Sequence, residues 1–458
     1  MKINTIEKLS FGLGGGVNAI KTDFFVWYLG AYYLTVLGLN PILTGSALLL
    51  ALFFDAISDP LIGALSDRIR SKFGRRHIFM GLSLLPISIT YFMLFIPDNS
   101  WSENLLFFWL IIFTILTRFS VTLFDIPHRA LAAEIPDTYE EKANIMSMRE
   151  GFQSIIALSH SFIILPFINI SVDDNWITVG LIGSIMMFAF GLISVLGTRS
   201  LIPDLYKWPE SLKKKNTFQE IREQLRFVYK NKTIIIFLLG SVTIQLAWGL
   251  ANSLTFLTQT QFWGLNALQI QEFIKIYFFS TLLSWFLVPK LVKAMEKRTI
   301  LISSLFIIGI FQAVPFIAYK FGFTPDLGSD SLVNFLSFII FITGTFSLIS
   351  LMTRESMVPD MIDQVQRESK LRQDGAISSL TSFCAKCMTG LGQFFSMFIL
   401  WLISFPSGSI EATLQQKEML AVFQGPMIMI LFLIPIFIFA GYQIDREQHK
   451  KILKDIKT

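Results

Sequence analysis

Residues 42–63 read ILTGSALLLALFFDAISDPLIG, an apolar run interrupted by two acids. A helix needs about 20 mainly apolar residues to cross a bilayer, so this run predicts a transmembrane helix. Asp55 and Asp59 are four residues apart and therefore project from one helical face. Two neighbouring carboxylates in a membrane are costly, because each disfavours the ionisation of the other. A cation bound between them would relieve both costs, so the pair indicates a coupling-ion site in a transporter.

The composition is typical of a chain that lies largely within a membrane. Of the 458 residues, 53% are hydrophobic and only 16% are charged. An average soluble protein has about 25% charged residues. The mean hydropathy is +0.59. With spans of about 20 residues and short loops, the chain has room for about twelve transmembrane helices. We therefore expect an all-α membrane protein rather than a soluble enzyme.

Apolar runs separated by polar loops predict the individual helices. A polar stretch at 202–231 divides them into two sets of six. We expect an N-terminal six-helix bundle over 1–201, a cytoplasmic central loop with a short interfacial helix over 202–231, a C-terminal six-helix bundle over 232–445 and a cytoplasmic tail over 446–458. The predicted helices are 11–38, 41–67, 77–97, 104–131, 142–169, 176–200, 233–262, 268–293, 299–320, 332–356, 375–405 and 418–443.

Charge in the loops predicts the orientation of these helices. Lys and Arg gather in the loops at 68–76, 207–232 and 293–298 and in the tail. The loops at 38–40, 97–100 and 171–175 contain neither residue. The positive-inside rule therefore predicts that both termini are cytoplasmic and that the protein lies in the cytoplasmic membrane. Because topology accounts for the net charge of +5, nucleic acid is not an expected partner.

The sequence lacks the common motifs of catalytic sites. The sequence has no His-Glu-x-x-His, Gly-x-Ser-x-Gly or phosphate-loop motif, so we expect no enzyme and no cofactor beyond a coupling ion. Cys384 and Cys387 form a Cys-x-x-Cys within an apolar helix and are interpreted as packing residues. His77, His128 and His160 are interpreted as packed or solvated residues rather than proton shuttles.

The loop after the first quoted helix carries an ordered motif. Residues 63–76 read GALSDRIRSKFGRR, which resembles the loop between the second and third helices of the major facilitator superfamily. A small residue allows close helix approach, and an acid among arginines can form charge-assisted links that hold the cytoplasmic side shut. The gating role would fall to Gly63, Asp67, Arg68, Gly74, Arg75 and Arg76. The alternative is a basic cytoplasmic loop with no gating role.

A further observation supports that superfamily. A weak internal repeat relates 129–137, followed by Arg149-Glu150-Gly151, to 354–363, followed by Gln373-Asp374-Gly375. Parallel six-helix halves with the solute site between them are the pattern of the major facilitator superfamily. The superfamily resemblance thus implies two bundles of six helices.

A narrower resemblance rests on several short motifs, which are 54–60 (FDAISDP), 122–127 (TLFDIP), 148–150 (MRE), 360–363 (DMID) with Arg372 and Gly375, and Lys386. Together they resemble the glycoside–pentoside–hexuronide:cation symporters, the family of the melibiose permease. The resemblance implies that Asp55, Ser58, Asp59 and Thr122 ligate the coupling cation, with Asp55 and Asp59 as the metal ligands if that cation is Na⁺. Oxygen ligands suit a hard ion. Ser58 replaces the family's Asn, so the choice among Na⁺, Li⁺ and H⁺ stays open. The alternative is that the acids pair with Lys386.

The same resemblance implies a solute site at Asn18, Asp125, Arg129, Arg149 and Lys386. Carboxylates and guanidinium groups can grip several hydroxyls in fixed geometry. Asn18 replaces an acid of the melibiose permease, and Arg129 replaces a Trp, so the site is more positive. That favours an anionic solute such as a hexuronide. The alternative is that Arg129 pairs with Asp125 one turn back, or points to the cytoplasm.

The leading hypothesis is cation-coupled symport of a sugar, glycoside or hexuronide by alternating access, with Na⁺ or H⁺ as the coupling ion. The expected partners are a small-molecule solute, a monovalent cation and membrane lipid. The second hypothesis is a carrier of a non-sugar solute, such as a lysolipid or an organic anion. A non-transporting membrane sensor is a remote third hypothesis.

Overall fold

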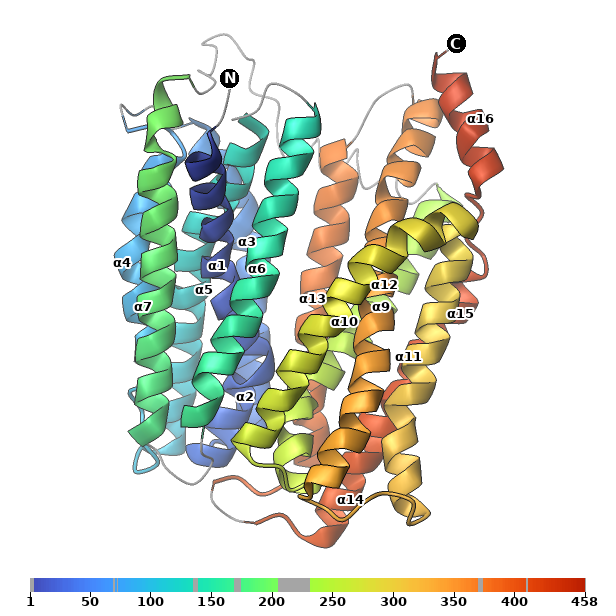
Figure 1. Ribbon diagram of the computed structural model, residues 1–458. Coiled ribbons are helices and arrows are strands. Elements are labelled where there is room, and N and C mark those ends of the chain that lie inside the picture. The colour runs from blue at the N-terminus through green and yellow to red at the C-terminus, as the bar shows by residue number, and fades with distance from the viewer. Residues whose placement is uncertain are drawn as a thin grey trace. The chain divides into compact units, whose positions relative to one another are not determined.

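The computed structural model describes residues 4–68, 71, 73–134, 139–168, 174–204, 231–369, 374–408 and 411–457. Over these residues the regular elements are helical, and none of them is a strand (Figure 1). The interfacial helix expected in the central loop lies outside the described residues.

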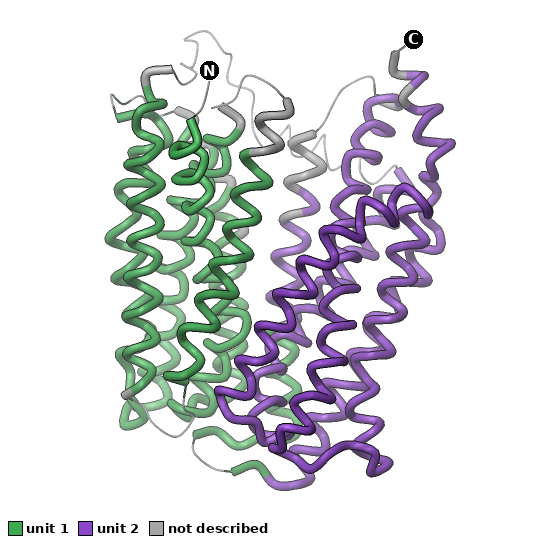
Figure 2. The backbone as a smooth tube through the Cα atoms, viewed as in Figure 1, with its two compact units in different colours: residues 1–212, 393–412 green, residues 213–392, 413–458 purple. Residues whose placement is uncertain are grey.

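The chain divides into two compact units, drawn in different colours in Figure 2. Unit 1 comprises residues 1–212 and 393–412. Its helices are α1 (Thr5–Trp27), continued by α2 (Leu29–Ala31) and the π-helix η1 (Tyr32–Val36), then α3 (Pro41–Arg68), α4 (His77–Met93), α5 (Glu103–Glu134), α6 (Tyr139–Ile164) and α7 (Asp174–Gly197), with short 3-10 turns η2 (Leu165–Phe167) and η3 (Arg199–Asp204). Within this unit α1 packs against α6 and α7, α3 against α5, and α4 against α5 and α7.

Unit 2 comprises residues 213–392 and 413–458. Its helices are α9 (Lys232–Leu257) with the π-helix η4 (Thr258–Phe262), α10 (Ala267–Ala294), α11 (Lys297–Lys320), α12 (Asp330–Ser369), α13 (Asp374–Leu402, whose residues 393–402 group with unit 1), α14 (Leu414–Val422), η5 (Phe423–Met427), α15 (Ile428–Phe439) and α16 (Arg446–Lys457). Here α10 packs against α12, α11 against α12 and α15, and α15 against α9. Each pair has its counterpart in unit 1, as parallel structural repeats require.

A second repeat marks the end of the first helical segment in each unit. The segment closes with a π-helix in both cases, η1 and η4. The same tripeptide follows, Gly38-Leu39-Asn40 in unit 1 and Gly264-Leu265-Asn266 in unit 2. Both glycines adopt a positive φ, 75° and 66°, which a side chain would strain. Each Asn side chain then accepts a hydrogen bond from the backbone that begins the next helix.

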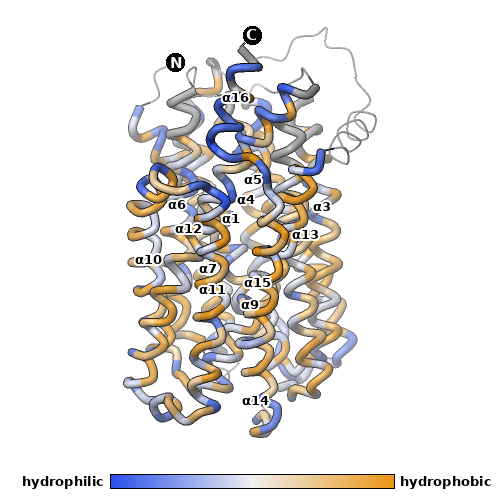
Figure 3. The backbone as a smooth tube through the Cα atoms, turned by 90° about the vertical axis from the view of Figure 1, so that its right-hand side faces the viewer, coloured by the Kyte–Doolittle hydropathy of each residue, from blue (hydrophilic) through white to orange (hydrophobic). Residues whose placement is uncertain are grey.

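Most of the long helices carry enough apolar residues to cross a membrane. Among the described residues, nine helices meet that requirement of length and hydropathy. The helix α4 is apolar but shorter, and α1 and α6 carry more charged residues, such as Lys21 and Arg149. In Figure 3, apolar residues run along the helices and hydrophilic residues gather near their ends. The chain is therefore an integral membrane protein.

The helix α12 continues beyond the predicted end at 356, to Ser369. Its extra turns are amphipathic. Met357, Met361 and Val365 recur every fourth residue and are fully buried, while Asp360 and Asp363 take part in polar contacts. A buried apolar stripe supports this extension although the segment is too polar to be recognised as a membrane span.

Glycines let α1 approach its neighbours closely. A Cβ on Gly12 would lie 2.5 Å from Phe152, and one on Gly15 would lie 3.0 Å from the carbonyl oxygen of Arg149. One on Gly16 would meet Ile156 at 2.7 Å. These glycines thus allow α1 to pack closely, and α6 is the helix that they contact.

Candidate transport site

A buried ion pair joins α3 to α5. Arg118 donates from Nη1 to Oδ2 of Asp55 at 2.7 Å, and both side chains are at most 7% exposed. The Arg118 guanidinium also lies 5.1 Å from the ring centre of Phe25. Within the described part of the chain, Oδ1 of Asp55 and Nε of Arg118 are buried without a hydrogen bond. The two charges therefore balance, but one acceptor oxygen of Asp55 and one donor nitrogen of Arg118 are not used in hydrogen bonds.

The other predicted cation ligands lie on the same two helices. Thr122 donates from Oγ1 to Oδ1 of Asp59 at 2.9 Å. Ser58 is buried and donates to the backbone oxygen of Asp55 at 3.3 Å. A hydroxyl that donates keeps its lone pairs, so both oxygens can still coordinate an ion. The structure thus places all four predicted ligands on α3 and α5, and adds a guanidinium that the sequence reasoning overlooked.

Lys386 was the expected alternative partner of the acids. The observed ionic partner of Asp55 is Arg118. Lys386 is exposed on α13, within unit 2. Arg118 was missed because it falls in the middle of a strongly apolar segment. A single cation in such a segment is itself the signal that should have drawn attention.

A second charged cluster, one turn further along α5, gathers three of the predicted solute residues. Arg129 donates from Nε to Oδ2 of Asp125 at 2.8 Å, and Arg149 of α6 donates to Oδ1. Arg149 is fully buried and also bonds Glu150. The Arg129 side chain is 41% exposed. The expected alternative, in which Arg129 pairs with Asp125 one turn back, is therefore realised, while its side chain stays partly exposed.

His128 holds Arg149 in place. The Nε of Arg149 can only donate, and it lies 3.4 Å from Nδ1 of His128, so that nitrogen must accept. The proton of the neutral ring is then on Nε2, which donates to the backbone oxygen of Phe11 at 2.9 Å. The ring is fully buried and stacks on Phe11 with centroids 4.2 Å apart. The buried ring of His128 thus joins α1, α5 and α6.

The two remaining solute candidates are Asn18 and Lys386. Asn18 lies half-buried on α1. Lys386, as noted, belongs to unit 2. The structure thus brings together Asp125, Arg129 and Arg149, and it adds His128 and Glu150 to them.

The predicted gating loop follows α3. Arg76 is buried and donates to Oγ of Ser66 at 2.7 Å, and Ser66 donates to the backbone oxygen of Gly63 at 2.9 Å. Gly74 has a φ of 82°, and a Cβ there would lie 3.2 Å from Ile202. The Arg76–Ser66 bond ties the loop to the end of α3, and Gly74 brings it close to η3. Arg75 is half-buried, and the side chains of Asp67 and Arg68 lie outside the described residues.

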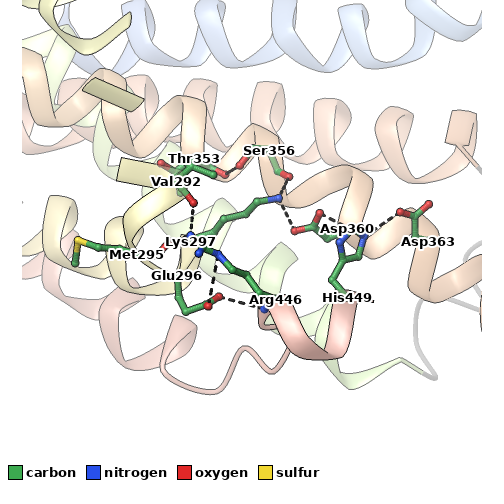
Figure 4. A network of polar contacts seen from close by, with 10 residues as sticks. All are labelled: Val292, Met295, Glu296, Lys297, Thr353, Ser356, Asp360, Asp363, Arg446 and His449. Carbon is green, nitrogen blue, oxygen red and sulfur yellow. Dashed lines mark hydrogen bonds and ion pairs between the residues drawn. The ribbon is translucent and has the colours of Figure 1, made fainter. Parts of the chain in front are cut away.

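Unit 2 has a polar network at the ends of α10, α11, α12 and α16 (Figure 4). Lys297 bonds Oδ2 of Asp360 at 2.6 Å. His449 lies 3.0 Å from Oδ2 of Asp363 and 3.7 Å from Oδ1 of Asp360. Arg446 donates to the backbone oxygen of Met295 at 2.7 Å. The network thereby fixes the amphipathic C-terminal helix to the rest of its unit.

Comparison with known proteins identifies the class. The family described as MFS/sugar transport protein matches residues 10–446. The chain therefore belongs to this family of major facilitator transporters, and it is a transporter rather than an enzyme.

Individual relatives cover the chain to different extents. The uncharacterized symporter YjmB of Bacillus subtilis is 22% identical over 99% of this chain and 96% of its own length. The putative glycoside/cation symporter YagG of Escherichia coli is 22% identical over 95% of this chain and 89% of its own length. The uncharacterized symporter sll1374 of Synechocystis is 32% identical over 34% of this chain, and the match spans 30% of that protein's length.

Solved structures show the same fold. The xylose transporter XylE of Escherichia coli, in an inward-open conformation, matches with a TM-score of 0.62 at 14% identity over 98% of both chains. The nucleoside transporter NupG matches with a TM-score of 0.66 at 13% identity over 96% of this chain and all of that one. The predicted major facilitator fold, with two bundles of six helices, is thus confirmed.

Proposed function

We propose that this chain is a secondary active transporter that couples uptake of a sugar, glycoside or hexuronide to a monovalent cation, by alternating access. The observation that carries the proposal is the pair of charged clusters inside the helices of unit 1, one built on Asp55 and Asp59 and one on Asp125. Charged groups within membrane helices are costly and serve binding or transport. Relatives named isoprimeverose transporter and putative sulfoquinovose importer support this class of solute.

The proposed cation ligands are Asp55, Ser58, Asp59 and Thr122. Their oxygens come from two packed helices, which suits a hard ion. An ion on these ligands would have to share Asp55 with the guanidinium of Arg118, 2.7 Å away. The carboxylate oxygen that lacks a hydrogen bond and the Asp59–Thr122 pair are the places where it would bind.

The proposed solute site is the cluster around Asp125. Asn18 and Lys386 are the other two residues that the family resemblance implies for solute binding. Arg149 is fully committed to protein partners, so its role is to hold Asp125. The Arg129 side chain is 41% exposed, so Arg129 is the group that would meet the solute. A cation in that position favours a solute that carries a carboxylate or another anionic group. A relative named glucuronide carrier protein homolog is consistent with that preference.

The remaining assignments concern topology and gating. We assign both termini to the cytoplasm and the protein to the cytoplasmic membrane, on the distribution of basic loops. Gly63, Asp67, Arg68, Gly74, Arg75 and Arg76 would close the cytoplasmic side. The Arg76–Ser66 bond supports that role, because it anchors the loop to α3.

The second candidate is a carrier of a non-sugar organic anion. The same exposed Arg129 favours it, since a guanidinium grips a carboxylate whatever the rest of the solute is. A lysolipid would instead need a largely apolar path with a polar cap.

A solute panel on purified protein tests these alternatives. Thermal unfolding is measured with methyl β-D-glucuronide, methyl β-D-galactoside, benzoate and a lysophospholipid, each with and without Na⁺. A ligand that binds only the folded state raises the unfolding temperature. We expect the glucuronide to give the largest shift. Counterflow of labelled glucuronide in proteoliposomes then separates a carrier from a sensor. If benzoate stabilises the protein and no sugar does, the sugar assignment is wrong.

A further inference from the structure

A further polar cluster, built on Asp23, lies between α1 and α6 and is separate from the clusters of Asp55 and Asp125. Nδ1 of His160 lies 2.7 Å from Oδ2 of Asp23. Ser161 donates from Oγ to Asp23 at 2.8 Å, and the hydroxyl of Tyr28 lies 3.1 Å from the same Oγ. The His160 side chain is fully buried and that of Asp23 is 8% exposed. His160, interpreted above as a packed or solvated residue, is therefore one half of a buried acid–base pair.

The hydrogen bonds define the protonation state of this pair. An ionised carboxylate can only accept, so Nδ1 of His160 carries the proton that it shares with Asp23. Nε2 is buried and has no hydrogen-bond partner within the described residues. A second proton there would leave a charged donor unsatisfied, which is costly in an apolar interior. The arrangement is thus a neutral imidazole beside a carboxylate, with a net charge of −1.

No cation in the neighbouring helices pairs with this charge in the described part of the chain. Arg118 of α5 is bound to Asp55. Lys21, two residues before Asp23 on α1, makes a different interaction. The other titratable groups that interact electrostatically with Asp23 are the hydroxyls of Tyr28 and of Tyr91 on α4, and both are neutral. From α7, the buried and uncharged Trp176 packs against Phe24. One further positive charge would therefore neutralise the cluster.

We propose that the Asp23–His160 pair is a proton-binding site through which this transporter couples to the proton gradient. The proposal rests on the cation-coupled transport proposed above, and it adds a second ion site to the one on α3. The chemistry selects the ion. The open ligand is a single imidazole nitrogen, which can bind one proton, whereas Na⁺ needs several oxygen ligands.

The proton step involves one atom. A proton from one side of the membrane adds to Nε2, which converts the pair from a net charge of −1 to an internal ion pair of Asp23 carboxylate and His160 imidazolium. The same proton leaves Nε2 to the other side, and the starting state is restored. The new N–H needs an acceptor that this conformation does not supply within the described residues. Conformations that supply one bind the proton more tightly, so protonation and conformational change are linked reciprocally.

The first test detects the proton without any solute. Infrared difference spectra of the full chain in Na⁺-free buffer are recorded between pH 5 and pH 8. We expect an imidazole protonation signal that is lost in His160→Gln and shifted in Asp23→Asn. Gln keeps an N–H that can bond Asp23 but takes no proton, so it preserves the local contact. His449→Gln, which changes a histidine of the C-terminal helix in unit 2, is the control and should keep that signal. An unchanged spectrum in His160→Gln overturns the proposal.

The second test measures coupling in proteoliposomes, with methyl β-D-glucuronide as the probe. We expect His160→Gln to keep counterflow of the labelled probe, but to lose accumulation driven by an inward proton gradient, down to the level of protein-free liposomes. Accumulation equal to that of the unmodified chain overturns the proposal. If the unmodified chain shows no counterflow with any solute of the panel, the proposed function fails, and the infrared result still decides whether His160 binds the proton.

Discussion

Arg118 and Asp55 form a buried ion pair, with Nη1 and Oδ2 2.7 Å apart. The pair lies where the sequence predicts a bound cation. A guanidinium on the chain thus supplies, at Asp55, part of the charge that a free ion would otherwise bring. Because removing one partner of a buried pair leaves the other uncompensated, the two residues should be strongly coupled in stability.

The substitution Arg118→Gln should expose that coupling. Loss of the guanidinium leaves Asp55 buried and unpaired, at a cost of about 3–5 kcal/mol in the free energy of unfolding. Na⁺ should then stabilise Arg118→Gln more than the unmodified chain, because the freed carboxylate can accept the ion. Thermal unfolding in NaCl against choline chloride measures both effects. The double variant Arg118→Gln/Asp55→Asn is the control and should lose the extra response to Na⁺. Equal Na⁺ shifts in all three proteins would contradict the assignment of Asp55 to the cation site.

Asp59→Cys tests the other acid of the pair. The hydrogen bond between Asp59 and Thr122 joins α3 to α5. Asp55, by contrast, already has Arg118 as its ionic partner. We expect uphill uptake in vesicles to be abolished under whichever gradient, Na⁺ or H⁺, drives the unmodified chain. Counterflow of solute, which needs no net coupling, should persist. Asp326→Cys, at an exposed position of unit 2, serves as the matched control. Unchanged uphill uptake in Asp59→Cys would remove this residue from the cation site.

Arg129 should determine the preference for anionic solutes. A hydrogen bond to a charged group contributes about 1.5–3 kcal/mol, so Arg129→Gln should weaken binding of methyl β-D-glucuronide by roughly 10- to 100-fold. Binding of methyl β-D-galactoside should change much less. Competition against labelled glucuronide in proteoliposomes gives both affinities. Lys275→Gln, in an exposed salt bridge of α10, controls for loss of positive charge alone. Equal losses for the two sugars would show that Arg129 does not recognise an anionic group.

The close packing of α1 predicts a contrast between two glycines. A Cβ on Gly14 would lie 2.5 Å from Oγ of Ser194 and 2.6 Å from Nε2 of His128. Gly14→Ala should therefore cost about 1–3 kcal/mol of stability through overpacking, and should disturb the histidine that holds Arg149. A Cβ on Gly81 of α4 would meet no other atom within 4 Å, so Gly81→Ala should be neutral or stabilising. Thermal unfolding compares them. Equal unfolding temperatures for the two variants would mean that α1 can shift to make room.

Helix positions and the pattern of two bundles could be predicted because they depend on hydropathy and length. The motif around Asp55 and Asp59 likewise placed Ser58 and Thr122 on the correct helices. Which charged side chains pair with one another could not be predicted. Arg118 lies in an apolar segment 63 residues from Asp55 along the chain, and Asp23 is 137 residues from His160. Such pairs depend on which helices pack together and in which rotation, which periodicity alone does not specify. The partners of His160 and His128 could not be predicted for the same reason.

In unit 2, Arg446 is expected to anchor the C-terminal helix α16 to the end of α10. Arg446 donates to the backbone oxygens of Val292 and Met295 at the end of α10, where helix carbonyls lack intrahelical partners. Arg446→Ala should release these carbonyls and detach the helix at its first turn. We expect faster hydrogen exchange in α16, measured by mass spectrometry, with the exchange of α9 unchanged. Lys450→Ala, one turn further along, removes a positive charge without touching that contact and is the control. If both variants exchange at the rate of the unmodified chain, the contacts of His449 with Asp360 and Asp363 suffice to hold the helix, and Arg446 is not its anchor.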